Sequence, residues 1–371
     1  MTVVFTSFGA AVGALAGSMP SIMRNANVDS ETVGLGLTIS TVMTVSAMSI
    51  GGHIARHMSN RAVLLAILPA FGLLLIAYLT AQSPMWFYLA IVPMGFAFGL
   101  TDLFMNAEAV AVEHDMRRPV FTAFHGAVST GVAVMAIVAS YVSTHIGTWA
   151  TGLISLSLFA LAWLMVWRAI PARPLAKGSA ARMASLPNKA ALVLLGMAAG
   201  LIIAAETAAL LWSATLLDEL APALAAIAGL GAAFFGLCNA AVRFPGDWLR
   251  SIFGDMPLLI VSLMIGIAGF LCLGLSGSFI SSVAAFAAVG LGLGLLIPCI
   301  FAMAARLVPE NRAGGLSFVS LLTAVPRSVA PVFFGLLAAQ FGTGAAFGLV
   351  AVALTAALVL ILALQRHIKS H

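Results

Sequence analysis

The chain has 371 residues, of which 62% are hydrophobic and only 8% charged, and its net charge is +5. Soluble domains carry about 25% charged residues, so this composition excludes a water-soluble protein of ordinary design. The apolar residues form continuous runs of about 20 residues, the length that a helix needs to cross a bilayer core. A membrane β-barrel would show short alternating segments instead. We therefore expect an all-α membrane protein.

The apolar runs predict twelve membrane-spanning helices. They are expected at 2–22, 32–55, 61–81, 85–106, 120–144, 147–169, 190–217, 223–244, 256–276, 279–304, 313–340 and 343–366. No basic segment precedes the first run, so we interpret it as a membrane helix and not as a cleaved signal peptide. The sequence leaves open whether native residues precede Met1.

Basic residues gather on one side of the predicted membrane. Fifteen of the 17 Lys and Arg residues fall in the connections after even-numbered helices, in the central loop or in the C-terminal tail. Of the other two, Arg24 lies on the opposite side and Arg327 lies inside a span. Because cytoplasmic connections carry an excess of Lys and Arg, we expect both termini in the cytoplasm, with the chain in a bacterial inner membrane.

The sequence also repeats itself after 194 or 195 residues. The matching features are Gly52–Arg56 with Gly246–Arg250, Gly95 and Gly99 with Gly290 and Gly294, and Arg118 and Phe124 with Arg312 and Phe318. Six predicted helices separate the copies, so the two halves have the same orientation, which is one of the known transporter plans. We expect a six-helix bundle at 1–170, a polar cytoplasmic linker at 171–189 and a second six-helix bundle at 190–371.

These features resemble the major facilitator superfamily: twelve helices in two parallel halves, a basic loop after the second helix, its copy after the eighth, and a long central loop. Three segments resemble the bacterial YbjJ-type subgroup, which is related to fucose-permease-like carriers. They are Gly99–Ala109, Phe124–Gly126 and Glu206–Ala214. The resemblance covers essentially the whole chain and implies a secondary transporter that works by alternating access.

The loop after the second helix departs from the pattern of the superfamily. That loop is associated with gating and usually carries an Asp before its basic residues. Here the first copy contains Arg56 and Arg61 without an acid, whereas the second copy keeps Asp247 before Arg250. The resemblance implies that these four residues take part in gating, and it leaves open how the first half latches.

Two ionisable side chains fall near the middle of predicted spans. Glu206 lies about 15 residues into the seventh helix and Arg327 about 14 residues into the eleventh, counted from the cytoplasmic side. Both therefore reach roughly 20 Å into the membrane, where a charge costs about 2.5–3.5 kcal/mol and commonly marks a pathway. Matching depth and opposite charge predict an ion pair, which either serves coupling and substrate binding or joins packed helices. Glu108, Glu113 and Asp115, in contrast, are interpreted as a solvated loop cluster.

Other polar side chains inside predicted spans allow two interpretations each. Asp102 and Asn106 share one face of the fourth helix, and they either take a proton or solute or form a structural hydrogen bond. His125 suits proton relay, because its unperturbed pKa is near 6.5, but a lone histidine also packs as a hydrogen-bonded residue. Trp212 either stacks on a solute or anchors at the outer interface, and Asn239 is equally open.

The sequence contains no enzyme motif, since it lacks a Walker loop, HExxH and GxSxG. No loop is long enough for an ATP-hydrolysing domain, so a gradient must supply the energy. We expect a monomeric carrier of a small organic solute, sugar-like or drug-like, in the lipid bilayer. The carrier is either coupled to protons or facilitative, and the sequence leaves open whether it imports or exports the solute. No cofactor, metal or nucleic acid is expected. The alternative is a non-transporting membrane receptor or assembly protein that keeps the carrier fold.

Overall fold

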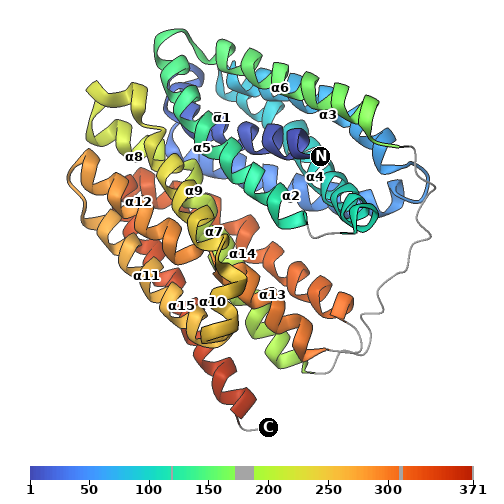
Figure 1. Ribbon diagram of the computed structural model, residues 1–371. Coiled ribbons are helices and arrows are strands. Elements are labelled where there is room, and N and C mark those ends of the chain that lie inside the picture. Colours follow the sequence, from blue (N-terminus) through green and yellow to red (C-terminus); the bar gives the residue numbers. More distant parts are fainter. Residues whose placement is uncertain (118–119, 172–187, 309–311, 370–371) are drawn as a thin grey trace. The chain divides into compact units, whose positions relative to one another are not determined.

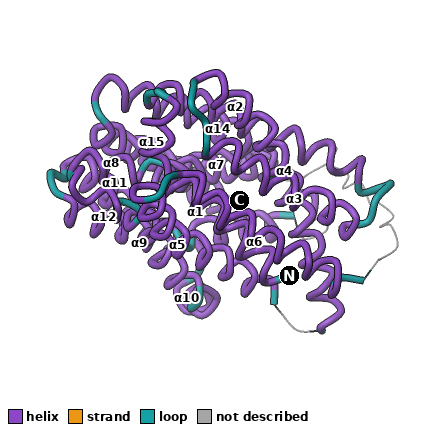
Figure 2. Tube along the Cα trace, turned by 90° about the horizontal axis from the view of Figure 1, so that it is seen from above, coloured by secondary structure: helices purple, strands orange, loops and turns teal. Residues whose placement is uncertain are grey.

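The structure is a computed structural model that describes residues 1–117, 120–171, 188–308 and 312–369 (Figure 1). Over these residues the chain forms helices joined by short connections and contains no strand (Figure 2). The predicted all-α class is confirmed. Most of the predicted linker at 171–189 lies outside the described residues.

By its internal contacts the chain divides into two units. Unit 1 comprises Met1–Gly178 and Leu211–Ala233, and unit 2 comprises Ser179–Leu210 and Phe234–His371. Unit 1 therefore includes a stretch of the second repeat as well as the first. The prediction of two bundles divided at 171–189 stays a prediction.

Six long helices form most of unit 1. They are α1 (Thr2–Ala26), α2 (Ser30–Ile54), α3 (Asn60–Leu79), α4 (Pro84–Met116), α5 (Phe121–His145) and α6 (Thr148–Ala169). Side-chain caps fix where three of them begin, because a capping oxygen satisfies a backbone N–H that has no partner within the helix. The oxygens of Asp29, Ser59 and Ser83 accept these bonds at the starts of α2, α3 and α4.

Glycines allow the closest helix contact of unit 1, between α1 and α5. Gly9, Gly13 and Gly17 face the α5 backbone at Val128, Val132 and Ala136, where an added Cβ would collide with a carbonyl oxygen in each case. Small residues at such spacing let helix backbones approach in a membrane, where packing replaces the hydrophobic effect. This contact makes α1 a buried helix of unit 1.

The second repeat contributes shorter pieces. Unit 2 contains α7 (Lys189–Leu211) up to Leu210, most of α9 (Leu230–Arg243), and α10 (Gly246–Phe253), α11 (Asp255–Leu275), α12 (Phe279–Leu293), α13 (Leu296–Leu307), α14 (Arg312–Phe341) and α15 (Thr343–Lys369). The intervening α8 (Ser213–Leu220) and 3-10 helix η1 (Pro222–Ile227) belong to unit 1.

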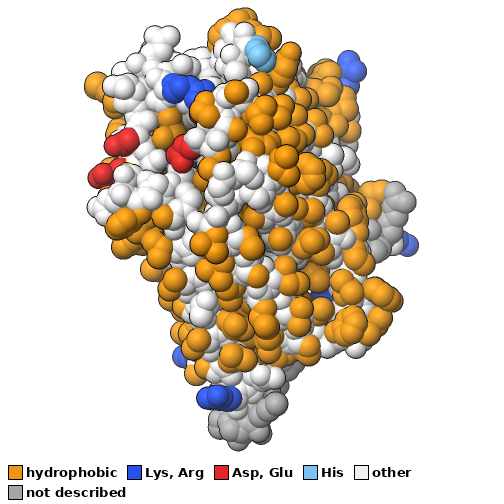
Figure 3. Space-filling view, turned by 90° about the vertical axis from the view of Figure 1, so that its left-hand side faces the viewer, with side chains coloured by type: hydrophobic (Ala, Val, Ile, Leu, Met, Phe, Trp, Pro, Cys, Tyr) orange, Lys and Arg blue, Asp and Glu red, His pale blue; other side chains and the backbone are white. Residues whose placement is uncertain are grey.

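Eleven helical segments in the described residues are long and apolar enough to cross a membrane, and α9 is a shorter apolar helix of 14 residues. One of these segments, Phe279–Leu307, is interrupted between α12 and α13. On the face shown in Figure 3, hydrophobic side chains cover most of the surface, and most of the charged groups lie near its edges. The predicted multi-span membrane protein is confirmed.

The second repeat differs from the predicted helices at several places. The spans expected at 190–217 and 223–244 are each broken, because α7 ends at Leu211 and the chain turns through α8 and η1 before α9. Pro222 starts η1 and lacks the N–H that a continuous α-helix would use there. The helix α10 lies in a segment that was expected to be a loop.

The sequence repeat has a counterpart in the packing of each unit. In unit 1, Gly95 packs on the backbone of Ser40 and Gly99 on that of Thr44. In unit 2, Gly290 packs on the backbone of Phe235 and Gly294 on that of Asn239. Every residue in the second set lies 195 positions after its partner in the first. The two copies thus use the same glycines for the same helix contact.

Candidate functional site

The carboxylate of Glu206 lies within unit 2, on α7 five residues before that helix ends. Its Oε1 atom accepts from Arg243 NH2 at 3.4 Å and from Asn239 Nδ2 at 3.4 Å. The Glu206 side chain is 19% exposed and that of Arg243 is 34% exposed. An acid, a base and an amide thus meet inside the apolar helices of unit 2.

A missing backbone donor explains where Arg243 is held. In a regular helix the carbonyl of Gly294 would accept from the residue four positions later, but that residue is Pro298, which has no N–H. The helix is interrupted there, between α12 and α13. Arg243 Nε donates to the Gly294 carbonyl oxygen at 3.0 Å. A buried carbonyl needs such a partner, so the break fixes the guanidinium beside Glu206.

The predicted ion partner of Glu206 was wrong. Within the described part of the chain, Glu206 pairs with Arg243 and makes no contact with Arg327. The reason is the helix register, because Gly196 packs on Leu322 and Gly200 on Pro326. Arg327 therefore lies at the level of the residue about five positions before Glu206 on α7. That level is roughly 7 Å closer to the start of α7 than Glu206 is.

Arg243 is a candidate site residue that sequence reasoning missed. It was assigned to a cytoplasmic connection as a topology signal, but it ends α9 and its guanidinium reaches inward. The available signal was its spacing from Asn239: residues four apart share one helix face. The structure places Asn239 beside Glu206, in agreement with its choice as a candidate, while its part in transport stays a prediction.

Asp102, Asn106 and His125 belong to unit 1. Asn106 Nδ2 donates to both the backbone oxygen and the Oδ1 atom of Asp102, each at 2.8 Å, which is the local bond that four-residue spacing allows. The exposed ring of His125 meets that of Phe5 edge to face, with centroids 5.5 Å apart. The contact of Asp102 with Asn106 fits the structural interpretation of that pair.

Two further residues of unit 1, Glu108 and Trp212, are buried in the structure. Glu108 was predicted to be solvated, but it is only 1% exposed and accepts from Asn60 Nδ2 at 3.1 Å. The reason is that α4 continues to Met116, so that Glu108 still lies within the packed helix. Trp212, at the junction of α7 and α8, is 1% exposed, so its ring is packed in protein.

The four residues that the loops were expected to use for gating each make contacts within their own unit. In unit 1, Arg56 contacts His53 Nδ1 at 3.0 Å, and Arg61 donates to the Trp167 carbonyl at 2.8 Å. In unit 2, Arg250 bonds Asp247 at 2.9 Å. The second copy of the loop thus keeps the acid and base paired, as its sequence suggested.

Comparisons with known proteins agree with this architecture. The family model for the Major Facilitator Superfamily matches residues 194–370. The membrane protein MosC of Rhizobium meliloti is 25% identical over 339 residues, which cover 91% of this chain and 83% of MosC. An uncharacterized MFS-type transporter of Yersinia pestis is 25% identical over 358 residues, covering 93% and 90% of the two chains.

These matches confirm the predicted resemblance to the major facilitator superfamily. A crystal structure of a mutant of the nucleoside transporter NupG superposes with a TM-score of 0.80, at 15% identity and over 98% of each chain. At this identity the similarity shows the fold alone. The family-model match and the relatives named as transporters support the predicted superfamily and a transporter rather than an enzyme. The YbjJ-type subgroup stays a prediction.

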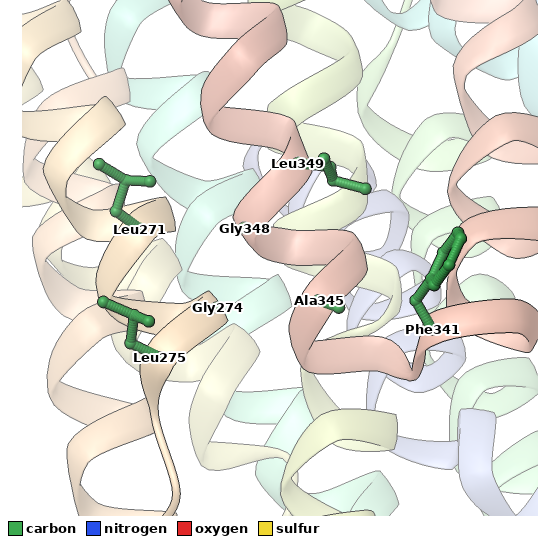
Figure 4. A pocket seen from close by; sticks show the side chains of 7 residues that line it. All are labelled: Leu271, Gly274, Leu275, Phe341, Ala345, Gly348 and Leu349. Carbon is green, nitrogen blue, oxygen red and sulfur yellow. The ribbon is translucent and has the colours of Figure 1, made fainter.

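Two pockets within unit 2 are apolar. One, of about 470 Å³, lies between α11 and α15, where Gly274 packs on Gly348 (Figure 4). A second, of about 280 Å³, is lined by aliphatic residues and phenylalanines of α7, α14 and α15, including Ala205 and Ala208 on either side of Glu206. Neither contains a charged side chain, so both suit lipid chains better than a polar solute.

Proposed function

We propose that this protein is a secondary active transporter of a small organic solute, driven by a proton gradient and working by alternating access. The observation that carries the proposal is the group formed by Glu206, Arg243 and Asn239 inside the helices of unit 2. Ionisable groups inside membrane helices are costly and mark ion and substrate pathways. Nothing in the proposal requires a second copy of the chain.

The geometry of Glu206 supports an exchangeable partner. Charge-assisted hydrogen bonds in proteins are commonly about 2.7–2.9 Å long, but both contacts of Glu206 are 3.4 Å and both use the same oxygen. The carboxylate is therefore loosely held. A proton that neutralises Glu206 would remove its attraction for Arg243, while the Gly294 carbonyl keeps the guanidinium in place.

This exchange defines a coupling cycle. With Glu206 ionised, its charge is balanced by Arg243; with Glu206 protonated, the guanidinium has N–H donors available for a polar group of the solute. Proton and solute would then enter and leave together. Asn239 is the neutral member of the group and can hydrogen-bond the carboxyl in either protonation state. In this cycle the chain is oriented with both termini in the cytoplasm, as the distribution of basic residues predicts.

Flux in proteoliposomes tests whether the chain is a carrier. The purified chain is reconstituted with an imposed pH gradient, and uptake is measured for labelled sugars, nucleosides, organic acids and amphipathic drugs. The proposal expects saturable uptake of at least one class that collapses when a protonophore removes the gradient. Saturable binding without flux would favour the receptor alternative and overturn the carrier.

A further inference from the structure

The short helix α10 of unit 2 exposes large apolar side chains. Trp248, Ile252 and Phe253 on the helix are 62%, 54% and 56% exposed, and Phe244 just before it is 74% exposed. Trp248 and Ile252 are four residues apart, so they share one face. A helix in contact with water would turn such a face toward the protein. Here it points outward.

The opposite side of α10 is fixed to unit 2 by polar contacts. Arg250 Nε bonds Asp255 Oδ1 at 2.7 Å, and Arg306 also bonds this carboxylate. Gly246 is buried, and a Cβ added there would lie 2.9 Å from a methyl group of Leu295. The orientation of α10 is therefore set by an ion-pair cluster on one side, which leaves the apolar face outward.

This apolar face continues the exposed surface of α9. On α9 the exposed residues Phe234, Leu237 and Ala241 follow one another at intervals of three and four. Within α9, residues at these intervals form one stripe. Phe244 in the turn that follows and Trp248 on α10 are exposed as well. In a membrane protein the exposed apolar stripe of a spanning helix faces lipid, so α10 lies where that lipid surface ends.

The first repeat shows that the fold does not require this apolar face. Gly52–Ser59 is the copy of Gly246–Phe253, 194 residues earlier. There the chain ends α2 and makes a turn, without a separate helix. Where the second copy has Ile252 and Phe253, the first has Met58 and Ser59, and exposed Arg56 and His57 dominate its surface. The apolar helix is thus particular to the second copy.

We infer that α10 is an interfacial anchor that inserts Trp248 and Ile252 into the headgroup and acyl-chain boundary of one leaflet. Helices with an apolar face bind in this plane of a bilayer, and tryptophan is enriched there. The leaflet is the cytoplasmic one in the proposed orientation. The apolar face carries no cation of its own, because Arg250 is engaged with Asp247 and Asp255. Insertion therefore depends on apolar area, and not on anionic lipid.

Spin labels in reconstituted protein test the anchor. Cys238, Cys272 and Cys299 are replaced by serine, and single cysteines at Trp248 or at His57 carry the label in vesicles of phosphatidylcholine. If α10 is an anchor, relaxation of the spin label at position 248 should be dominated by oxygen, which concentrates in lipid. At position 57, a control in the exposed turn of the first copy, relaxation should be dominated by a water-soluble nickel complex. Nickel-dominated relaxation at both positions would overturn the inference.

A fluorescence measurement covers the case in which the labelled variants fold poorly. The full chain and its Trp248→Phe variant are reconstituted in lipid brominated near the headgroup, and the difference between their emission spectra isolates Trp248. If α10 is an anchor, the emission of Trp248 should be strongly quenched, and the quenching should not change when phosphatidylglycerol is added. Absence of quenching, or quenching that appears only with the anionic lipid, would contradict it.

Discussion

At the scale of single residues, the ion pair of Glu206 and Arg243 offers a sharp stability test. Removing one member of a buried pair leaves an uncompensated charge, at a cost of about 3–5 kcal/mol for a fully buried pair. Arg243 is a third exposed, so we expect a smaller loss. Arg243→Gln should lower the thermal unfolding temperature in detergent, and adding Glu206→Gln should restore most of it. Additive losses in the double variant would show that the two side chains do not interact.

The proline of α13 gives a second test at this scale. Pro298→Ala supplies the N–H that the Gly294 carbonyl lacks, and proline inside a helix costs about 3 kcal/mol. The variant should unfold at a higher temperature, because the helix closes, and should transport more slowly, because Arg243 loses its acceptor. Both quantities come from one preparation, by thermal unfolding and by flux. A variant that transports at the normal rate would contradict the role given to the break.

Asp29, which lies outside the membrane-spanning helices, should make the stability of the fold slightly dependent on pH. The backbone N–H of Thr32 donates to its carboxylate, which lowers the pKa of Asp29 below its usual value. A lowered folded pKa gives stability that is present above the unfolded pKa and is lost as the pH falls through the folded pKa. Unfolding temperature of the chain and of Asp29→Asn, measured from neutral pH downward, should converge in acid. A constant gap would contradict this.

At the scale of elements, the segment α8–η1 is held to α1 and α5 within unit 1. Arg24 pairs with Asp218 at 2.6 Å, and Ser140 donates to the Ala225 carbonyl at 2.8 Å. Gly229 packs directly on the Ala136 carbonyl, where a Cβ would collide with backbone. This segment belongs to the second repeat in sequence and to the first by contact.

Gly229→Ala should push this segment away from α5. A reporter cysteine at Leu216, which is 2% exposed, is placed in the cysteine-free background and treated with a membrane-impermeant thiol reagent. Labelling should rise with Gly229→Ala. It should not change with Gly277→Ala, where an added Cβ meets nothing within 4 Å. Equal labelling in the two variants would show that the close contact does not hold the segment.

The positions of the helices could be predicted from the sequence, but the contacts between them could not. All twelve predicted runs contain helix in the structure, because hydropathy reports which stretches are placed in lipid. Hydropathy carries no information on which helices meet, and so the partner of Glu206 was misassigned to Arg327. The break at Gly294 was also missed, since a proline in an apolar run does not show whether the helix bends or opens. The inward reach of Arg243 depends on that break.

At the scale of the whole molecule, the two repeats supply a common frame, but the pair of Glu206 and Arg243 has no charged counterpart at the matching positions of the first repeat. Thr44 and Gly99 occupy the places of Asn239 and Gly294, and Met48 stands 195 residues before Arg243. In unit 1 the Thr44 hydroxyl donates to the carbonyl of Gly95, which is the counterpart of Gly290 and not of Gly294. We propose that this asymmetry assigns proton coupling to the second repeat.

The measurement that tests this account most directly compares Glu206→Gln with Glu31→Gln, a control in which the acid is exposed at the start of α2. Both variants are reconstituted, and solute accumulation is followed with and without an imposed pH gradient. We predict that Glu31→Gln accumulates solute in response to the gradient, while Glu206→Gln remains folded and does not. Gradient-driven accumulation by Glu206→Gln at the rate of the unaltered chain would contradict the central claim.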